Sequence, residues 1–160
     1  MKHILILALF LAASYAAFAR LGETERELIK RFGQPISRSN VTMFAQSKIW
    51  VLGSGLLFEQ DVWKISCTVI DERCVAVSYS KRGEWTDAQI DTVLAANAQG
   101  VQWTEIMNGL RQYSRSWRRT DGTMAKWSPN GLWMETPYLQ HARDIIEAKA
   151  KAEVTSRPKI

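Results

Sequence analysis

The hydrophobic and polar positions divide the chain into three helical stretches separated by two blocks of short strands. Apolar residues recur at helical spacing after Thr24, Thr86 and Pro137, as expected for helices with one buried face. In the two intervening blocks, apolar and polar residues alternate instead, as in strands that bury one face. The order predicts an α+β domain in which an antiparallel sheet packs against helices.

The helix starts carry specific signals. Thr24 with Glu27, and Thr86 with Gln89, each form a capping box, in which the two side chains satisfy free backbone N–H groups at the helix start. Pro137 suits the first position of the last helix, because its missing N–H would have no partner there. Since the two halves begin alike, the sequence suggests two tandem α-β-β-β units.

The predicted boundaries follow from this pattern. Residues 20–153 form one domain, with repeat halves at 20–82 and 83–153. The last helix is expected to fray from about Lys149, and residues 154–160 are expected to be a disordered tail.

The first strand block contains two short pieces, Val41–Phe44 and Lys48–Leu52. The polar segment Ile36–Asn40 before them and the Gly53–Gly55 segment after them are predicted to be turns. A serine between two glycines is typical of a loop here, because the G-x-S-x-G pattern of a nucleophile elbow is absent.

A hairpin is predicted from Asp61 to Lys81, turning through the three-residue loop Asp71–Arg73. In this register Cys67 faces Val77 on the apolar side, whereas Cys74 lies on the polar side. Export favours oxidation of a cysteine pair, but diverging Cβ vectors oppose a bridge. The sequence therefore leaves open whether the two cysteines form a disulfide.

The second strand block is expected to begin with a helical turn over Thr104–Leu110. Two hairpin turns follow, Asp121-Gly122 and Asn130-Gly131. They predict a meander of three strands, Ser116–Thr120, Thr123–Trp127 and Leu132–Thr136.

This meander supplies the candidate binding surface. The Asp121-Gly122 turn places Trp117 opposite Lys126 and Arg119 opposite Met124, so that aromatic and cationic groups share one face. The other face, with Ala125, Trp127 and Met134, is the expected core. The candidate partner-binding residues are Arg115, Trp117, Arg119, Lys126 and Trp133. The alternative is that the Trp rings are core and that the Arg stems cover them.

The N-terminus predicts export. Ile4–Phe18 is almost wholly apolar, and Ala17–Ala19 gives the small-x-small pattern that signal peptidase reads. Residues 1–19 are therefore expected to be a signal peptide cleaved after Ala19, with no membrane span left after cleavage and a periplasmic or secreted product. An uncleaved anchor is the alternative, although the run is shorter than the roughly 20 apolar residues of a typical span.

Charge and composition narrow the range of partners. Without the signal the chain has 20 basic and 16 acidic residues, which is only mildly basic, and nucleic acid is an unlikely partner for an exported protein. Seven tryptophans are many for this length. A protein partner is favoured, with an anionic glycan or a lipid headgroup as alternatives.

No catalytic residues, metal site or cofactor site are predicted. His141 has no evident nucleophile partner, and with two cysteines it makes a poor metal set. Carboxylates that could in principle form an acid–base pair are Glu59, Asp61, Asp87, Asp91, Glu105 and Glu135.

The first helix also carries a motif with a counterpart in known proteins. Gly22, Thr24, Leu28, Phe32, Gly33 and Pro35 match the pattern G-x-T-x-x-x-V-x-x-x-L-G-x-P, with Leu for Val and Phe for Leu. The chain thus resembles small envelope lipoproteins of the SmpA/OmlA type and the β-lactamase inhibitor protein. The resemblance implies a small, non-enzymatic binding module of the cell envelope. The lipidated cysteine of the lipoproteins is absent, so membrane attachment in their manner is not implied.

Together these features favour an exported, non-catalytic interaction module that binds a protein or other partner in the envelope or outside the cell. The alternative from another class is an envelope glycan hydrolase that uses a carboxylate pair.

Overall fold

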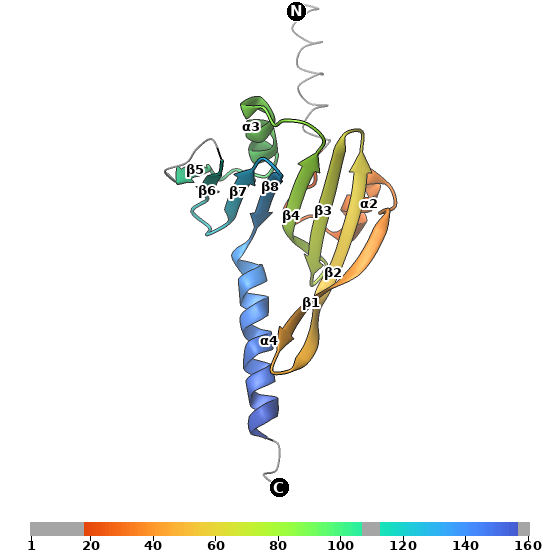
Figure 1. Cartoon of the computed structure of the whole chain (residues 1–160), viewed down its shortest axis with the longest axis vertical. Coiled ribbons are helices and arrows are strands. Elements are labelled where there is room, and N and C mark those ends of the chain that lie inside the picture. Colours follow the sequence, from red (N-terminus) through yellow and green to blue (C-terminus); the bar gives the residue numbers. More distant parts are fainter. Residues whose placement is uncertain (1–17, 107–112, 157–160) are drawn as a thin grey trace, which may run out of the picture.

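The computed structural model describes residues 18–106 and 113–156, and its fold is α+β, as predicted. The strands form one antiparallel sheet in the order β1-β2-β3-β4-β8-β7-β6-β5 (Figure 1). The strands are β1 (Ser37–Ala45), β2 (Lys48–Gln60), β3 (Trp63–Ile70), β4 (Arg73–Lys81), β5 (Thr104–Ile106), β6 (Arg115–Arg118), β7 (Met124–Ser128) and β8 (Gly131–Glu135). The helices are α2 (Glu25–Phe32), α3 (Asp87–Ala96) and α4 (Pro137–Thr155).

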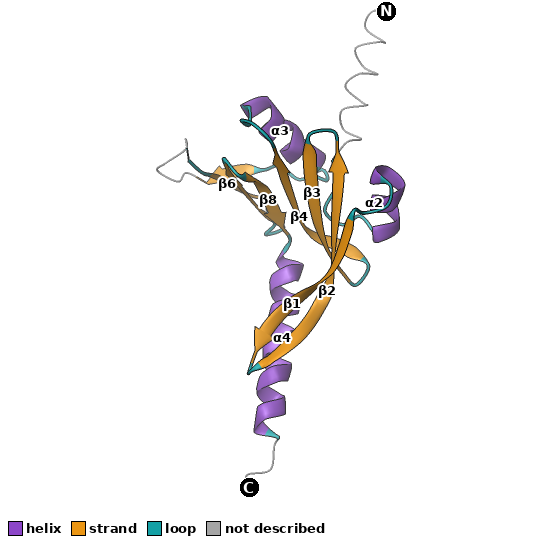
Figure 2. Cartoon of the chain, turned by 45° about the vertical axis from the view of Figure 1, so that its right-hand side comes forward, coloured by secondary structure: helices purple, strands orange, loops and turns teal. Residues whose placement is uncertain are grey.

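The sheet consists of two consecutive four-stranded meanders, which meet where β4 pairs with β8. Each meander follows one helix, so each half has four strands after its helix rather than the three expected. α2 and α3 lie on the same face of the sheet (Figure 2), because Leu28 and Phe32 of α2 share one buried cluster with Ile90 and Val93 of α3. Neither α2 nor α3 covers the opposite face of the sheet.

The helix starts agree with the sequence. The hydroxyl of Thr24 accepts a hydrogen bond from the Glu27 amide, and that of Thr86 accepts one from the Gln89 amide, each at 3.2 Å. α4 starts at Pro137.

The end of α4 differs from the expectation. The helix continues through Lys149 to Thr155 instead of fraying. Tertiary contacts stabilise its last turns, because Ala150 is buried and Glu153 forms an ion pair with Lys48 of β2. The remainder of the expected tail, 157–160, lies outside the described residues.

The first two strands are longer than the sequence indicates. Ile36–Asn40 and Gly53–Gly55, both predicted as turns, lie almost entirely within β1 and β2. A Cβ at Gly53 would lie 2.2 Å from the Val69 carbonyl oxygen, and one at Gly55 would lie 2.7 Å from the Ser39 hydroxyl. Gly53 therefore allows a close backbone approach inside the sheet, and Gly55 leaves room for a side chain of the neighbouring strand.

The predicted helical turn at Thr104 is also wrong where the structure describes it. Thr104–Ile106 is the edge strand β5, paired with Ser116–Arg118. The rest of that predicted turn, residues 107–110, lies outside the described residues.

The β3–β4 hairpin turns through two residues rather than three. Asp71 and Glu72 both have positive φ, 47° and 63°, as a tight hairpin turn requires. A bulge then restores the predicted register farther along, with Cys67 opposite Val77. The consequence is that Cys74 faces the same side as Cys67, so the prediction that the two cysteines diverge is wrong.

Both cysteines are buried as free thiols in the main core. The Cys74 thiol lies 3.4 Å from the Ala76 carbonyl oxygen. A hydrogen bond with the Cys67 thiol, together with burial, raises the pKa of Cys74 well above its usual value. The thiol form is therefore favoured over the thiolate, which makes Cys74 a poor nucleophile in the folded protein.

Asn97, at the end of α3, joins three separate parts of the core. Its side chain accepts a hydrogen bond from the Leu21 amide at 3.0 Å. It donates to the Tyr79 hydroxyl at 3.1 Å and to the Val93 carbonyl at 3.0 Å. Asn97 is fully buried, as are its partners Tyr79 and Val93, so water cannot replace these bonds.

We therefore expect Asn97→Ala to lower the free energy of unfolding by about 3 kcal/mol, because a buried N–H and a buried hydroxyl lose their partners. Urea denaturation measures the change. Asn40→Ala, at an exposed position on β1, serves as the control and should change stability by less than about 0.5 kcal/mol. Equal effects of the two substitutions would contradict the role given to Asn97.

Candidate interaction surfaces

The candidate binding strands β6 and β7 pair one residue away from the predicted register. Trp117 lies opposite Ala125, and Lys126 lies opposite Ser116. The cause is the turn, which is a three-residue loop ending at Gly122, whose φ is +85°, in place of the two-residue turn expected. Because side chains alternate along a strand, this slip moves Trp117 to the other face of the sheet.

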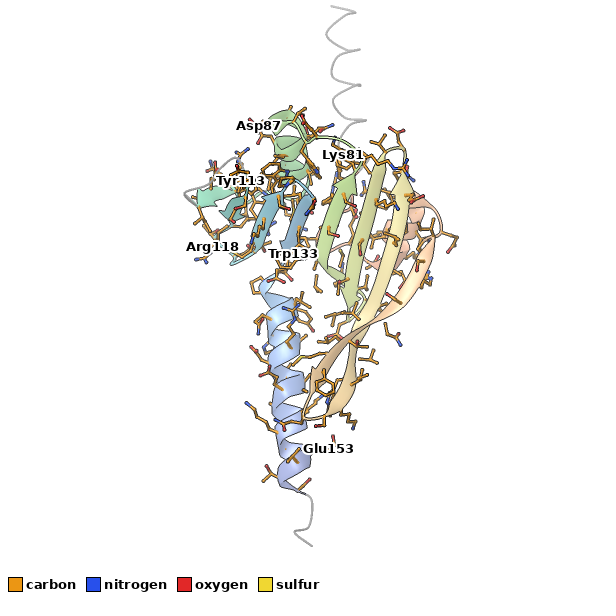
Figure 3. The ribbon with its side chains drawn as sticks, in the orientation of Figure 1. Lys81, Asp87, Tyr113, Arg118, Trp133 and Glu153 are labelled. Carbon is orange, nitrogen blue, oxygen red and sulfur yellow. The ribbon has the colours of Figure 1, made fainter. Side chains whose placement is uncertain are left out.

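The predicted surface is thereby divided. Trp117 is 4% exposed and Arg119 is 5% exposed, so both belong to the interior and the prediction that Trp117 is exposed is wrong. Trp133 is 38% exposed and pairs with Lys126, which is also exposed. Both lie on the face of the sheet without α2 and α3, which we call the open face (Figure 3). Ala125 and Met134 are buried in the core, as expected. A binding role for Lys126 and Trp133 remains a prediction.

The guanidinium of Arg115 has its charged and aromatic partners within the chain. Its guanidinium forms ion pairs with Asp87 at 3.0 Å and with Glu105 at 3.1 Å, and it stacks over the Trp117 ring at 4.9 Å. Only about a sixth of its side chain is exposed (16%). This arrangement matches the alternative, in which arginine covers a buried tryptophan, and leaves little of the cation for a partner.

Arg119 holds a buried polar cluster together. It donates to the Asn97 carbonyl at 2.6 Å, lies over the Trp103 ring at 5.5 Å, and forms an ion pair with Asp121. Hydrogen bonds from Arg119 and from the Thr123 amide hold the pKa of Asp121 at about 2, against an ordinary value of 3.8. The cluster fixes the β6–β7 loop and therefore the register that buries Trp117.

Among the described residues, the two most exposed large apolar side chains lie on the extended hairpin of β1 and β2, a surface that the sequence did not identify. We call residues Val41–Leu52 the arm. Phe44, Ile49 and Val51 are 71%, 67% and 58% exposed. Phe44 and Ile49 are cross-strand partners, and Val51 lies two positions along from Ile49, so all three share one face of the arm.

A signal for this surface is present in the sequence. Of the residues Lys48–Leu52, four in succession are apolar, so a two-stranded arm must place apolar side chains on both of its faces. Only one face can lie against the rest of the molecule. The alternation rule assigns such residues to a core, and it does not show that the strands leave the body of the sheet.

α4 lies beside the arm and contacts both of its strands (Figure 1). Near the tip, both carboxylate oxygens of Glu153 lie 3.1 Å from the ammonium of Lys48 (Figure 3). The same ammonium lies 4.5 Å from the centre of the Trp50 ring. The arm is therefore supported along one side by the helix, while its apolar face remains open.

Two hollows bear on the enzymatic alternative. One, of about 450 Å³, is lined by Glu59, Asp61 and Trp63 together with several cations. Glu59 is about half exposed and lies 3.4 Å from Lys64, as expected for a surface ion pair rather than for a catalytic acid. The second, of about 580 Å³, lies where the β3–β4 turn meets the start of α4. Its carboxylates are Asp71, which accepts a hydrogen bond from Tyr138, and Asp121, which pairs with Arg119.

Three of the other candidate carboxylates lie beside arginines. Burial raises the pKa of Glu135, and its neighbour is Arg143 at 4.0 Å. Asp87 and Glu105 both contact Arg115. Among the described residues there is no group of three or more His, Cys, Asp or Glu side chains placed to hold a metal ion.

No family model matches the chain, and no curated protein does. Two solved structures are distantly similar in fold. One is a cysteine-rich secretory protein from Staphylococcus aureus, with 8% identity and a TM-score of 0.48 over 74% of this chain and 45% of that one. The other is an extracellular protein containing an SCP domain from Bacillus anthracis, with 9% identity and a TM-score of 0.47 over 76% of this chain and 46% of that one. The chain spans less than half the length of each.

The helices of the described residues include none that is both long enough and apolar enough to cross a membrane.

The two tryptophans provide a direct test of the register. Trp117→Ala is expected to lower the free energy of unfolding by about 3–5 kcal/mol, because it opens a cavity in the core. Trp133→Ala, on the open face, should cost less than about 1 kcal/mol. Thermal and urea unfolding of both variants measure the difference. If Trp133→Ala were the more damaging, the faces would be assigned the wrong way round.

The Arg119–Asp121 pair predicts a pH dependence. The pKa of Asp121 is lower in the folded protein than the ordinary 3.8, so its contribution to stability is present above about pH 4 and is lost as the pH falls toward 2. Because 42% of the Asp121 side chain is exposed, we expect at most about 1 kcal/mol after solvent screening. Asp121→Asn should flatten the fall in stability between pH 4 and pH 2. Asp91→Asn, on the exposed face of α3, is the control and should keep the wild-type slope.

Proposed function

We propose that this protein is an exported, non-catalytic interaction module that binds a protein partner through the apolar face of the arm. The observation that carries this is the exposure of Phe44, Ile49 and Val51 on one face of a supported hairpin. Exposed apolar side chains that gather in one place are typical of interaction sites, whereas isolated ones are ordinary.

The charges around the arm favour a protein over an anionic glycan or a lipid headgroup. The two cations on β1 and at the start of β2 already have partners within the chain. Arg38 pairs with Glu25, and Lys48 pairs with Glu153. The arm therefore offers a nearly neutral apolar surface, which a protein can match with its own apolar side chains.

The backbone of β1 offers a second means of recognition. β1 is at one end of the strand order, so its outer side has no neighbouring strand within the described sheet. An extended segment of a partner could pair with this edge while its side chains cover Phe44. Trp133 and Lys126 on the open face of the sheet are a second, smaller surface.

Export rests on the apolar N-terminus and its small-x-small pattern. The resemblance of the first helix to envelope lipoproteins and to the β-lactamase inhibitor protein supports a binding role of this kind. The glycan hydrolase is the weaker interpretation, because Glu59, which lines the hollow of about 450 Å³, forms a surface ion pair.

The double substitution Phe44→Thr and Ile49→Thr tests the proposal. Threonine keeps the strand preference but removes the apolar surface, so we expect at least a tenfold loss of partner capture from native envelope extract. The melting temperature should change little, because both side chains are exposed in the folded protein. Quantitative mass spectrometry of captured proteins, with intact protein as the reference, gives the readout.

Trp133→Ala is the matched control, since it removes an exposed aromatic residue elsewhere. Capture that survives the double substitution but fails with Trp133→Ala would move the binding site to the open sheet face. If the captured protein is this chain itself, the arm is a self-association surface, and analytical ultracentrifugation would then show concentration-dependent dimers.

A further inference from the structure

The segment from Phe18 to Leu21, at the end of the apolar N-terminal run, is part of the folded core. Ala19 is fully buried, Leu21 is 1% exposed and Phe18 is 7% exposed. The Phe18 ring meets Trp63 and Tyr79 edge to face, with ring centres 5.6 Å and 5.8 Å apart. Such contacts are typical of well-packed aromatic residues in a core.

Polar contacts fix the same segment. The Tyr79 hydroxyl donates a hydrogen bond to the Ala19 carbonyl and accepts one from Asn97. The Leu21 amide donates to Asn97, and the Leu21 carbonyl accepts a bond from Gln99. Tyr79 is fully buried, so its hydroxyl would have no solvent acceptor if the Ala19 carbonyl were removed.

Cleavage after Ala19 would remove two of these core groups. The Phe18 ring would leave a cavity beside Trp63, and the Tyr79 hydroxyl would lose its acceptor. The small-x-small pattern that predicts this site is therefore in conflict with the packing. A second pattern of the same kind lies three residues earlier, at Ser14-Tyr15-Ala16.

We propose that signal peptidase hydrolyses the Ala16–Ala17 peptide bond, so that the mature protein begins at Ala17 and retains Phe18 and Ala19. The reaction consumes one water, leaves a carboxylate on Ala16 and creates a new amino group on Ala17. Ser14 and Ala16 provide the two small side chains of the recognition pattern. This inference depends on export but not on the binding surface of the proposed function.

One contact is compatible with either site. The Arg20 backbone nitrogen lies 3.0 Å from a carboxylate oxygen of Glu23. If cleavage occurred after Ala19, this nitrogen would become an ammonium and would keep Glu23 as its partner. The two cleavage sites therefore differ in whether the Phe18 ring and the acceptor of the Tyr79 hydroxyl are retained.

The test is the N-terminus of the mature protein. The full chain is produced in an exporting bacterial host, and the secreted or periplasmic product is identified by intact mass and by its N-terminal peptide. We expect Ala17 as the first residue. A product that begins at Arg20, or an uncleaved product that begins at Met1, would overturn the proposal.

Two matched substitutions locate the recognition pattern. Ser14→Asp places a charge in the Ser14-x-Ala16 pattern and should remove the product that begins at Ala17. Ala17→Asp places the same charge in the Ala17-x-Ala19 pattern and should leave cleavage at residue 16 in place. The reverse result would assign cleavage to Ala19.

The structural reason is tested separately with two chains made without a signal, one beginning at Ala17 and one at Arg20, each after an initiator methionine. The chain from Arg20 should melt at least about 5 °C lower, because it lacks the Phe18 ring and the Ala19 carbonyl. Phe18→Ala in the longer chain should give a large part of the same shift. Equal melting temperatures for the two chains would show that the segment adds nothing to the fold and would remove the reason for the earlier site. A result at this step says nothing of partner capture, so it is independent of the test of the arm.

Discussion

The buried amide of Asn97 is the contact on which the arrangement of the two halves depends. Its side chain binds the N-terminal segment through Leu21 and the first meander through Tyr79. Its backbone carbonyl accepts from Arg119, which belongs to the loop of the second meander. A buried amide of this kind is stabilising only when its groups are all satisfied, and it then specifies one arrangement of the surrounding elements. Asn97 thus links the start of the domain, the centre of the sheet and the β6–β7 loop.

The loop held by Arg119 determines which tryptophan is available at the surface. With the guanidinium between Asn97 and Asp121, the loop ends at Gly122 and the strands pair so that Trp117 faces the core. Trp133 takes the opposite face, which α2 and α3 do not cover. The face on which each of the two tryptophans lies is therefore a consequence of polar contacts at the end of these strands rather than of the aromatic residues themselves.

Local signals in the sequence predicted most of the fold. The capping boxes of α2 and α3, the proline at the start of α4 and the α+β class were all correct, because each depends on residues that are close in sequence. The halves of the β3–β4 hairpin were paired correctly beyond its turn, with Cys67 opposite Val77. Predicting these features does not require knowing which residues make contact across long sequence distances.

The errors arise where turn length depends on distant contacts. The β3–β4 turn has two residues rather than three, and the β6–β7 turn has three rather than two. Because one residue of slip reverses the faces, the first error misplaced Cys74 and the second misplaced Trp117. Gly53 was read as part of a turn because its need for close approach to Val69 arises only once β2 and β3 are paired. Candidate site residues on those strands could therefore not be assigned to a face from the sequence alone.

In the arm, tertiary contacts with α4 hold an exposed apolar surface in one conformation. A two-stranded hairpin alone is only marginally stable in water, and its apolar face would not be held in one conformation. Here α4 contacts both strands, and Glu153 holds Lys48 near the tip. A binding element that is ordered before it meets its partner loses less conformational entropy on association, so more of the apolar contact energy remains for affinity. The extension of α4 beyond Lys149 thus follows from its contacts with the arm, and it gives the helix a role as the support of the exposed face that carries Phe44 and Ile49.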